Sequence, residues 1–324
     1  MSIAGRTRPD ACPGALQVHQ AADGPLARVR IPGGLLSAHQ LRVLAACAEE
    51  LGSGVIELTS RANLQVRGLS DPGAFAERIA AAGLLPSPTH ERVRNIVASP
   101  LVDRSLIVEL DRALCGRPEL AGLPGRFLFA LGETGLPADV TLVDDRLLLA
   151  GRESDLPVTT GAMLEAAGAF LRLRTAEWRI SELGPERVAD ALGARLGNPW
   201  KGVPPSTEPG PQQALIPLGR LSPAQLLALA EAAAEVRLTP WRTVVMARVP
   251  DGFVTDPDSP WAGVTACTGS PGCAKSLADV QADAARWTGA RPVHFAGCDR
   301  LCGLPPGPVT VMLATPGGYE ERQK

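Results

Sequence analysis

The sequence contains one pattern twice, and this duplication limits the folds that the chain can adopt. Residues 30–45, RIPGGLLSAHQLRVLA, align in register with residues 215–230, LIPLGRLSPAQLLALA. The alignment continues from residues 56–68, IELTSRANLQVRG, to residues 236–248, VRLTPWRTVVMAR. Long repeats in register indicate that the two halves of the chain share an ancestor and a fold.

Each copy predicts a helix that is followed by strands. Ser37 and Gln40 have the spacing of a capping box before an amphipathic stretch that Gly52 ends. Ser222 and Gln225 repeat this start in the second copy. The segments after each helix are rich in branched residues, which favour strands. This order predicts an α+β sandwich with helices on one face of each sheet.

The composition allows large cores and excludes some classes of function. A chain of 324 residues with 45% hydrophobic content can form one large or two medium domains. The net charge of -2 argues against a nucleic-acid binder. The sequence also lacks an apolar stretch of membrane-spanning length and the apolar core of a signal peptide. We therefore expect a cytoplasmic protein without nucleic-acid or membrane partners.

Four of the seven cysteines form two glycine-rich pairs near the C-terminus. Cys267 and Cys273 are spaced C-x5-C, and Cys298 and Cys302 are spaced C-x3-C. Four thiolates are the usual ligands of a cubane cluster, and small neighbours let backbone amides approach the sulfurs. Residues 275–287 predict a helix whose positive N-terminal end would favour thiolate at Cys273. The pattern predicts a 4Fe-4S cluster bound by these four cysteines.

Three other roles of the cysteine pairs fit the sequence less well. Structural zinc sites normally use the tighter C-x2-4-C spacing. Disulfides require an oxidising compartment, and nothing in the sequence indicates secretion. Buried inert thiols explain single cysteines such as Cys47 and Cys115, but not four cysteines in two glycine-rich pairs.

The motifs around the cysteines carry a resemblance to a known family. TACTGSPGCAKS and the later GCDRLCG resemble the cluster motif of the nitrite and sulfite reductase superfamily, in which the last cysteine also bridges to a sirohaem iron. DACPGALQVHQAADGPLARVRIPGG near the start and VRLTPWRTVVM in the middle look like the precorrin-3B synthases, an oxygen-dependent branch of that superfamily. The resemblance covers nearly the whole chain.

The resemblance implies an α+β fold with duplicated ferredoxin-like half-domains and a nitrite/sulfite reductase-type α/β cluster domain about a pseudo-twofold axis. A tetrapyrrole would lie between the copies, beside the cluster. The expected parts are an N-terminal segment (1–24), a first ferredoxin-like half-domain (25–90), a first reductase-like domain without a cluster (91–196), a proline-rich linker (197–213), a second ferredoxin-like half-domain (214–255) and the cluster domain (256–324).

Arginines are the expected ligands of the tetrapyrrole carboxylates, because a guanidinium binds a carboxylate with two parallel hydrogen bonds. Arg61 matches the family's T-x-R-x-N-x-Q strand, Arg94 falls in its RNI segment, and Arg242 lies near the position that is pseudo-symmetric to Arg61. Arg126 keeps the first positive charge of the reductase motif LPRKFK, here LPGRFLF, whereas Leu128 replaces the second. The lost lysine disfavours the reduction of a small anion.

The resemblance to precorrin-3B synthases implies hydroxylation of precorrin-3A with formation of a lactone. The reaction would use dioxygen and an electron donor such as NAD(P)H, through a reductase or a ferredoxin, with the cluster transferring electrons. A separate non-haem iron is also expected in that family, and Cys12, His19 and Asp23 are candidate ligands. His294 is a candidate neighbour of the cluster.

Two other functions stay open at this point. A small sirohaem-dependent sulfite or nitrite reductase would bind sirohaem beside the cluster. A non-catalytic electron carrier would hold the cluster and bind no tetrapyrrole, but a carrier needs no large pocket between duplicated halves.

Overall fold

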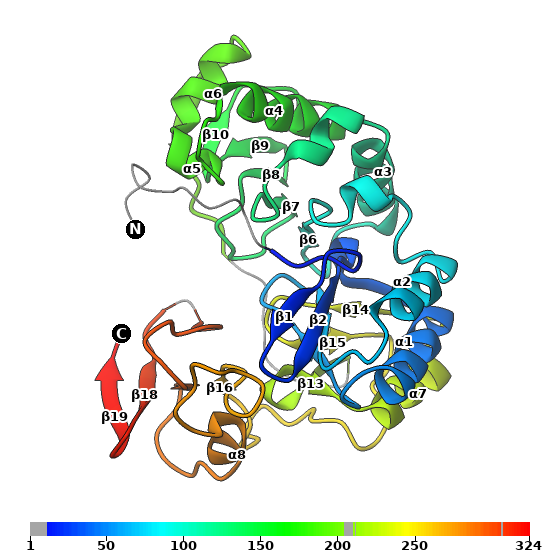
Figure 1. The fold of residues 1–324 in the computed structure, drawn as a ribbon. Helices are drawn as coiled ribbons and strands as arrows, with labels where there is room; N and C mark the ends of the chain where they lie inside the picture. The colour runs from blue at the N-terminus through cyan, green and yellow to red at the C-terminus, as the bar shows by residue number, and fades with distance from the viewer. Residues whose placement is uncertain (1–11, 204–209, 211, 306) are drawn as a thin grey trace.

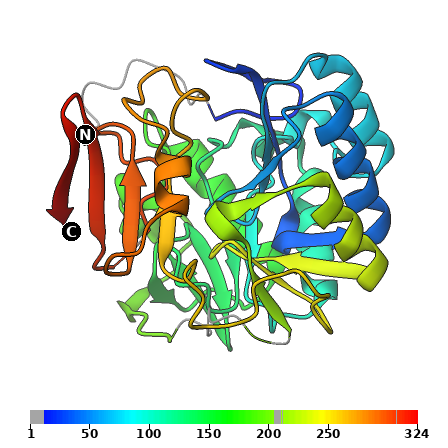
Figure 2. The same cartoon turned by 90° about the horizontal axis from the view of Figure 1, so that it is seen from below.

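The computed structural model describes residues 12–203, 210, 212–305 and 307–324. Residues 1–11 of the expected N-terminal segment and residues 204–209 and 211 of the expected linker lie outside this description. A central unit holds both copies of the repeat (Figure 1). Along the chain, one α/β part comes between the two copies and the other follows the second copy. Figure 2 shows the red C-terminal strands and the blue helices on opposite sides of the molecule.

The two sheets of the central unit exchange a strand. The short strand before the helix of copy two pairs with the sheet of copy one, where Arg220 lies opposite Glu57. The strand before the helix of copy one pairs with the sheet of copy two, where Ser37 lies opposite Glu235. One sheet has the order β1 (His19–Ala21), β2 (Gly24–Val29), β5 (Leu64–Val66), β4 (Ile56–Leu58) and β13 (Arg220–Leu221), and the other has β12 (Gln213–Leu215), β15 (Thr243–Val245), β14 (Glu235–Leu238) and β3 (Leu35–Ser37).

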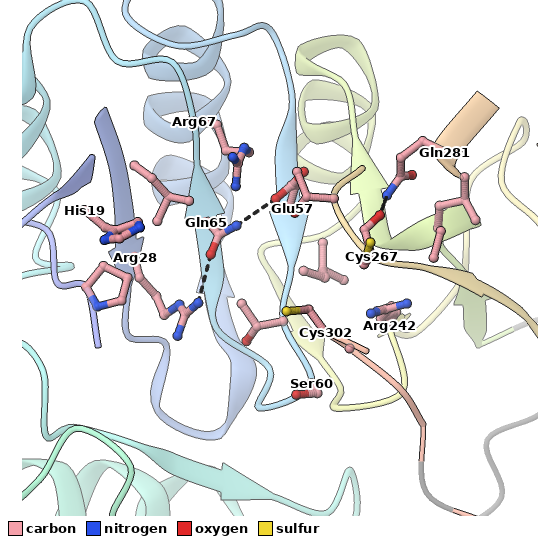
Figure 3. A pocket seen from close by; sticks show the side chains of 18 residues that line it. His19, Arg28, Glu57, Ser60, Gln65, Arg67, Arg242, Cys267, Gln281 and Cys302 are labelled. Carbon is pink, nitrogen blue, oxygen red and sulfur yellow. Dashed lines mark hydrogen bonds between the residues drawn. The ribbon is translucent and has the colours of Figure 1, made fainter. Parts of the chain in front are cut away.

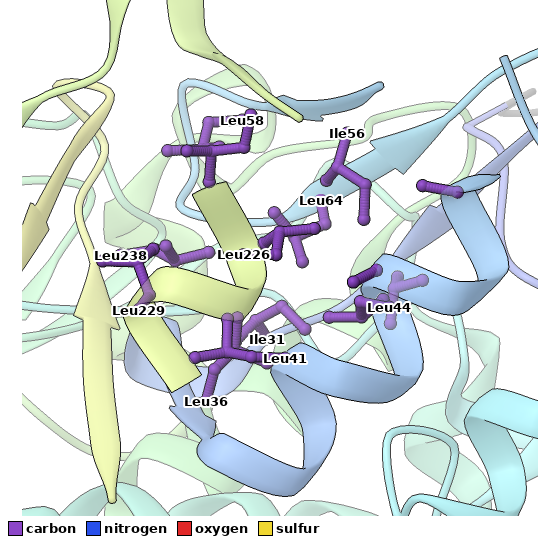
Figure 4. Packing of buried hydrophobic residues seen from close by; sticks show 14 of the residues in the cluster. Ile31, Leu36, Leu41, Leu44, Ile56, Leu58, Leu64, Leu226, Leu229 and Leu238 are labelled. Atoms are coloured by element: carbon purple, nitrogen blue, oxygen red, sulfur yellow. The ribbon is translucent and has the colours of Figure 1, made fainter. Parts of the chain in front are cut away.

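Helices α1 (Ala38–Glu50) and α7 (Pro223–Ala232) pack together and bury the leucines of both copies in one core (Figure 4). Both predicted capping boxes are present. The side chains of Ser37 and Ser222 each accept the backbone N–H of the glutamine three residues later, and the side chain of that glutamine accepts the backbone N–H of the serine. A further helix, α2 (Pro72–Ala81), follows the first sheet, with the Asp71 side chain as its cap.

A matching turn confirms the register of the repeat. Thr59 donates its N–H to the carbonyl of Asn63 at 2.9 Å, and Thr239 donates to Thr243 at 3.0 Å. The fourth of the five turn residues has a positive φ in both copies, 55° at Ala62 and 60° at Arg242. Arg242 therefore aligns with Ala62, one position beyond the equivalent of Arg61.

The two flanking parts share a topology of three parallel strands followed by an antiparallel one. The first sheet contains β6 (Ile96–Ala98), β7 (Phe129–Leu131), β8 (Val140–Val143), β9 (Arg146–Leu149), β10 (Arg152–Ser154) and β11 (Leu196–Pro199), with helices α3 (Arg104–Cys115), α4 (Thr160–Leu173), α5 (Ile180–Leu183) and α6 (Pro185–Ala191). The second contains β16 (Val264–Ala266), β17 (Val293–Ala296), β18 (Thr310–Thr315) and β19 (Gly318–Gln323), with α8 (Val280–Ala285). The shared topology extends the duplication beyond the central unit.

Short 3-10 turns complete the chain at η2 (Pro32–Gly34), η3 (Pro88–His90), η4 (Pro118–Gly122) and η5 (Pro217–Gly219). Every helix among the described residues is too short or too polar to span a bilayer.

The start of the expected linker is part of a sheet instead. Residues 196–199 form β11, which pairs with β10. The Trp200 N–H then donates to the carbonyl of Gly151 at 2.9 Å, and its indole N–H donates to Glu133 at 2.7 Å. The proline-rich composition did not predict this strand. Because β11 lies at the edge of its sheet, its proline breaks no hydrogen bond to a further strand.

Because the core is shared, we expect Leu226→Ala to destabilise both copies together. Leu226 is fully buried, so its truncation should cost about 2–5 kcal/mol of unfolding free energy. The matched control is its neighbour Leu227, which is 41% exposed and whose truncation should cost about 0.5 kcal/mol or less. Urea unfolding followed by circular dichroism measures both values. Separate melting of the copies in Leu226→Ala would contradict a shared core.

Candidate functional site

The four paired cysteines line one cavity of about 280 Å³. Cys267 directly follows β16, and Cys273 lies in the loop that leads to α8. Cys298 and Cys302 lie in the loop between β17 and β18. The carboxyl ends of neighbouring parallel strands meet at one edge of the sheet, and this brings the two distant pairs together.

The surroundings of the thiols suit a group of positive metal ions. Burial raises the pKa of Cys267 and of Cys302, and the neighbouring cysteines raise both further. The N–H of Gly297 donates to the sulfur of Cys267 at 3.2 Å, as expected around a cluster thiolate. Within the described residues, no three His, Cys, Asp or Glu side chains gather closely enough for a single ion.

The predicted helix after Cys273 is shorter than expected. Residues 274–279 are turns, and α8 begins only at Val280. The Asp279 side chain accepts the N–H of Ala282 and so caps the helix itself. The expectation that this helix directs its N-terminus at Cys273 is therefore wrong.

A second cavity of about 410 Å³ adjoins the cysteine cavity, and the two share His19, Arg67, Cys267 and Cys302 in their walls (Figure 3). Strands of copy one form one wall, while Arg242 from copy two lies beside the cysteines. The cavity therefore joins the cysteine site to both halves of the central unit.

A polar relay fixes the side chains on the strand wall of the second cavity. Arg28 donates to the Gln65 side-chain oxygen at 2.9 Å, and the Gln65 amide donates to Glu57 at 2.8 Å (Figure 3). Our sequence analysis missed Arg28, Glu57 and Arg67 as residues of this wall. Gln65 is the last residue of the T-x-R-x-N-x-Q motif. Because side chains alternate between the two faces of a strand, the alternation from Gln65 along the paired strands predicts which neighbouring side chains share its face.

Arg242 is a buried cation that lacks a complete set of partners. Its Nη1 is buried and forms no hydrogen bond with any described residue. Burial lowers the pKa of this guanidinium. Two glycines leave room for it, because a Cβ at Gly219 would lie 2.7 Å from its Cδ and one at Gly303 would lie 3.0 Å from its Nη2. The arrangement favours an anionic ligand at Arg242.

Arg61 lies near a further group of arginines rather than in the wall of either cysteine-lined cavity. Burial lowers its pKa to about 10, and the nearby Arg179 lowers it too. Burial lowers the pKa of Arg30 to about 9, with Arg28 adding to the effect. Arg30 is 2% exposed, and its Nη1 has no partner among the described residues. These arginines extend the positive potential from the strand wall toward Arg61.

The structure does not bring Arg94 to the second cavity. Arg94 is 3% exposed and donates from Nε and Nη2 to Asp111, both at 2.7 Å. Its Nη1 donates to the carbonyl of Leu84 at 3.2 Å. This bidentate pair uses the guanidinium within the fold, so the expectation of a substrate ligand is wrong for Arg94.

Arg126 is also outside both cysteine-lined cavities. It is exposed, and its guanidinium carbon lies 4.7 Å from the centre of the Trp178 ring, which is a cation–π contact. Leu128 is buried in a small apolar group with Val97, Ala130 and Ala138. Neither side chain of the LPGRFLF motif supplies a charge to the site.

A carboxylate that the sequence analysis missed anchors the N-terminal motif. Glu91 accepts the backbone N–H groups of Ala15 at 2.7 Å, Leu16 at 2.6 Å and Gln17 at 3.1 Å. A Cβ at Gly14 would lie 2.4 Å from this carboxylate, so the motif requires glycine there. The anchored segment places Pro13 in the wall of the second cavity.

The candidate ligands of a non-haem iron do not come together. Asp23 forms a salt bridge with Arg67 at 2.8 Å, whereas His19 lines the two cavities. Cys12 lies in the electrostatic field of Arg30 and Arg61 instead. These three residues therefore do not fit an iron site in this structure.

His294 lies on β17 and is fully buried, with its Nδ1 2.9 Å from the Thr265 hydroxyl. Burial lowers its pKa to about 4, and the positive charge of Arg242 lowers it further. A Cβ added at Gly303 would lie 3.9 Å from Cε1 of His294, which places His294 next to the cysteine loop. The prediction that His294 is a neighbour of the cysteine site agrees with this position.

Comparison with known proteins gives similarity over most of the chain. It is 27% identical to a ferredoxin–nitrite reductase of Synechococcus elongatus, over 86% of this chain and 74% of that protein. It is 26% identical to a precorrin-3B synthase of Sinorhizobium sp, over 96% of this chain and 82% of that protein. The solved structure of the Mycobacterium tuberculosis NirA protein superposes with a TM-score of 0.68 at 20% identity, over 92% of this chain and 73% of that one.

A family model locates the similarity on the repeat itself. Residues 19–73 and 213–255 match the nitrite/sulfite reductase ferredoxin-like half domain. These two segments contain the strands that the copies exchange and the turns that match. The predicted fold class and the predicted resemblance are thus confirmed: two segments of this chain match the nitrite/sulfite reductase ferredoxin-like half domain, and the chain has a fold similar to that of the NirA protein.

Proposed function

We propose that this chain is an oxidoreductase of cobalamin biosynthesis that hydroxylates precorrin-3A, with lactone formation, to give precorrin-3B. The observation that carries the proposal is the joined pair of cavities, in which four cysteines adjoin a wall of arginines. The first feature suits electron transfer, and the second suits a carboxylated substrate. An electron carrier alone would not need the second cavity.

Cys267, Cys273, Cys298 and Cys302 would hold a 4Fe-4S cluster. When bound there, such a cluster supplies single electrons. The backbone N–H of Gly297 would stabilise the thiolate of Cys267. Desolvation raises the pKa of Cys267 and Cys302, and the positive charge of bound metal would favour their thiolate forms.

The arginines would bind and orient the substrate. A precorrin carries several carboxylates, and Arg242 has a buried donor ready for one of them. Arg28 is held in place by Gln65, so it can meet a carboxylate without reorganising. In the overall reaction one oxygen atom of dioxygen enters the product and the other leaves as water, which consumes two electrons and two protons. The electron donor would be NAD(P)H through a reductase, or a ferredoxin.

Two observations favour this reaction over the alternative, a small sirohaem-dependent sulfite or nitrite reductase. Leu128 is buried in an apolar group where the reductase motif has a lysine, and Arg126 contacts Trp178 outside the cavity. The alignment with the precorrin-3B synthase also covers more of both chains than the alignment with the ferredoxin–nitrite reductase. The 27% identity to the nitrite reductase keeps sirohaem as the competing ligand of the same cavity.

We expect anaerobically purified protein to contain four irons and four acid-labile sulfides without sirohaem, as one cubane cluster requires. Absorption and EPR spectra, with iron, sulfide and extracted pigment quantified on one sample, measure this. Incubation with precorrin-3A, dioxygen and a reductant should then give a product heavier by one oxygen atom. Stoichiometric sirohaem with nitrite or sulfite reduction would show that the alternative is right.

The cysteine assignment predicts that Cys267→Ser and Cys302→Ser lose the cluster. Serine replaces a thiolate ligand by a weakly acidic hydroxyl, which binds iron poorly. Cys115→Ser is the matched control, because Cys115 ends α3 and lies in neither cysteine-lined cavity. Iron and sulfide analysis should show full loading in the control alone. Full loading of Cys267→Ser would remove Cys267 from the ligand set.

The two arginines that we first grouped together should behave differently. Arg242→Ala should weaken binding of a carboxylated tetrapyrrole such as uroporphyrin by about 10- to 100-fold, the effect of one charged hydrogen bond. Arg94→Ala should leave the affinity of the folded protein unchanged and cost about 3 kcal/mol of stability, because it leaves Asp111 without its partner. Fluorescence titration and urea unfolding separate the two effects, and equal affinity losses would contradict the assignment.

A further inference from the structure

Arg67 connects three distant segments of the chain at the cysteine site. It follows β5 and is 7% exposed. Its Nε and Nη2 donate to the two carboxylate oxygens of Asp23, both at 2.8 Å, and Asp23 lies in the turn between β1 and β2. Nη2 also donates to the carbonyl of Gly272, the residue before Cys273. One guanidinium thus joins the N-terminal hairpin, the strand wall and the cysteine loop.

The packing at Gly272 shows that this contact is close. A Cβ added there would lie 2.9 Å from the Thr268 side chain, 3.0 Å from the Asp23 carboxylate and 3.4 Å from Nε of Arg67. The loop therefore needs glycine at this position to reach the ion pair. Arg67 also lines both joined cavities, so its charge lies at the boundary between the cysteines and the arginine wall.

We propose that Arg67 and Asp23 are positioning residues that hold the cysteine loop and set the reduction potential of the cluster. This inference rests on the proposed cluster at the four cysteines. A reduced cluster carries one more negative charge, so a nearby cation stabilises it and a nearby anion destabilises it. The two charges of the pair nearly cancel in the wild-type protein, and removing either one exposes the other.

The pair therefore predicts opposite shifts for two single variants. Arg67→Gln leaves the Asp23 carboxylate uncompensated and should move the potential to more negative values. Asp23→Asn leaves the guanidinium uncompensated and should move it to more positive values. The double variant removes both charges, so its potential should return toward the wild-type value. A loop that is merely loosened would not shift in opposite directions.

Arg237 provides a control, because it holds a loop that has no cysteines. Its Nη1 donates to the carbonyls of Ser99 at 2.9 Å, Pro100 at 2.9 Å and Val102 at 3.0 Å. Residues 95–102, NIVASPLV, align with residues 266–273, ACTGSPGC, so these carbonyls lie in the loop that corresponds to the cysteine loop. Arg237→Gln removes the same kind of contact from a residue that lines neither cysteine-lined cavity, so it should lower stability and leave the potential unchanged.

The experiment is a redox titration with dithionite, followed by EPR, on the full chain with iron and sulfide measured for every variant. Arg67→Lys keeps the charge, and its potential should stay close to that of the wild type even if Arg67→Gln loads poorly. Potentials of Arg67→Gln and Asp23→Asn that are unchanged, or shifted in the same direction, overturn the inference while leaving the cluster in place. A wild-type protein without any cluster overturns the proposed function, and this inference with it.

Discussion

The exchange of one short strand between the copies is the constraint on which the rest of the structure depends. β13 completes the sheet of copy one, and β3 completes the sheet of copy two. Neither copy can bury its sheet alone, because the leucines of α1 and α7 meet in one core. This fixed geometry places Arg242 of copy two opposite the strands of copy one, so the second cavity is a product of the pairing.

Polar groups that are cut off from water lie in and near the joined cavities. Buried guanidiniums at Arg30 and Arg242 each retain a donor without a partner among the described residues. Partial desolvation on the other side raises the pKa of the Cys267 and Cys302 thiols. Such groups are costly in an empty fold and become favourable when an anionic ligand and a metal cluster bind. Binding of the proposed ligands would therefore offset the stability that these groups cost.

Local patterns predicted the fold well, because a capping box or a turn is determined by residues close in sequence. The start of α7 at Ser222 and Pro223 and the four-cysteine cavity follow from such patterns. Long-range partners explain the failures. Arg94 was misassigned because Asp111, 17 residues later, is one of many possible partners. Arg67 was missed because its partners lie 44 and 205 residues away in the sequence.

The asymmetry between the halves explains why a duplicated chain has one site. Position 57 of the first copy aligns with position 237 of the second. Glu57 faces the second cavity through Gln65, whereas Arg237 donates to three carbonyls of the loop that aligns with the cysteine loop. These bonds hold the loop of the first half to the central unit without metal. The second half keeps its cysteines and leaves its charges unmatched, and there the fold retains the capacity for chemistry.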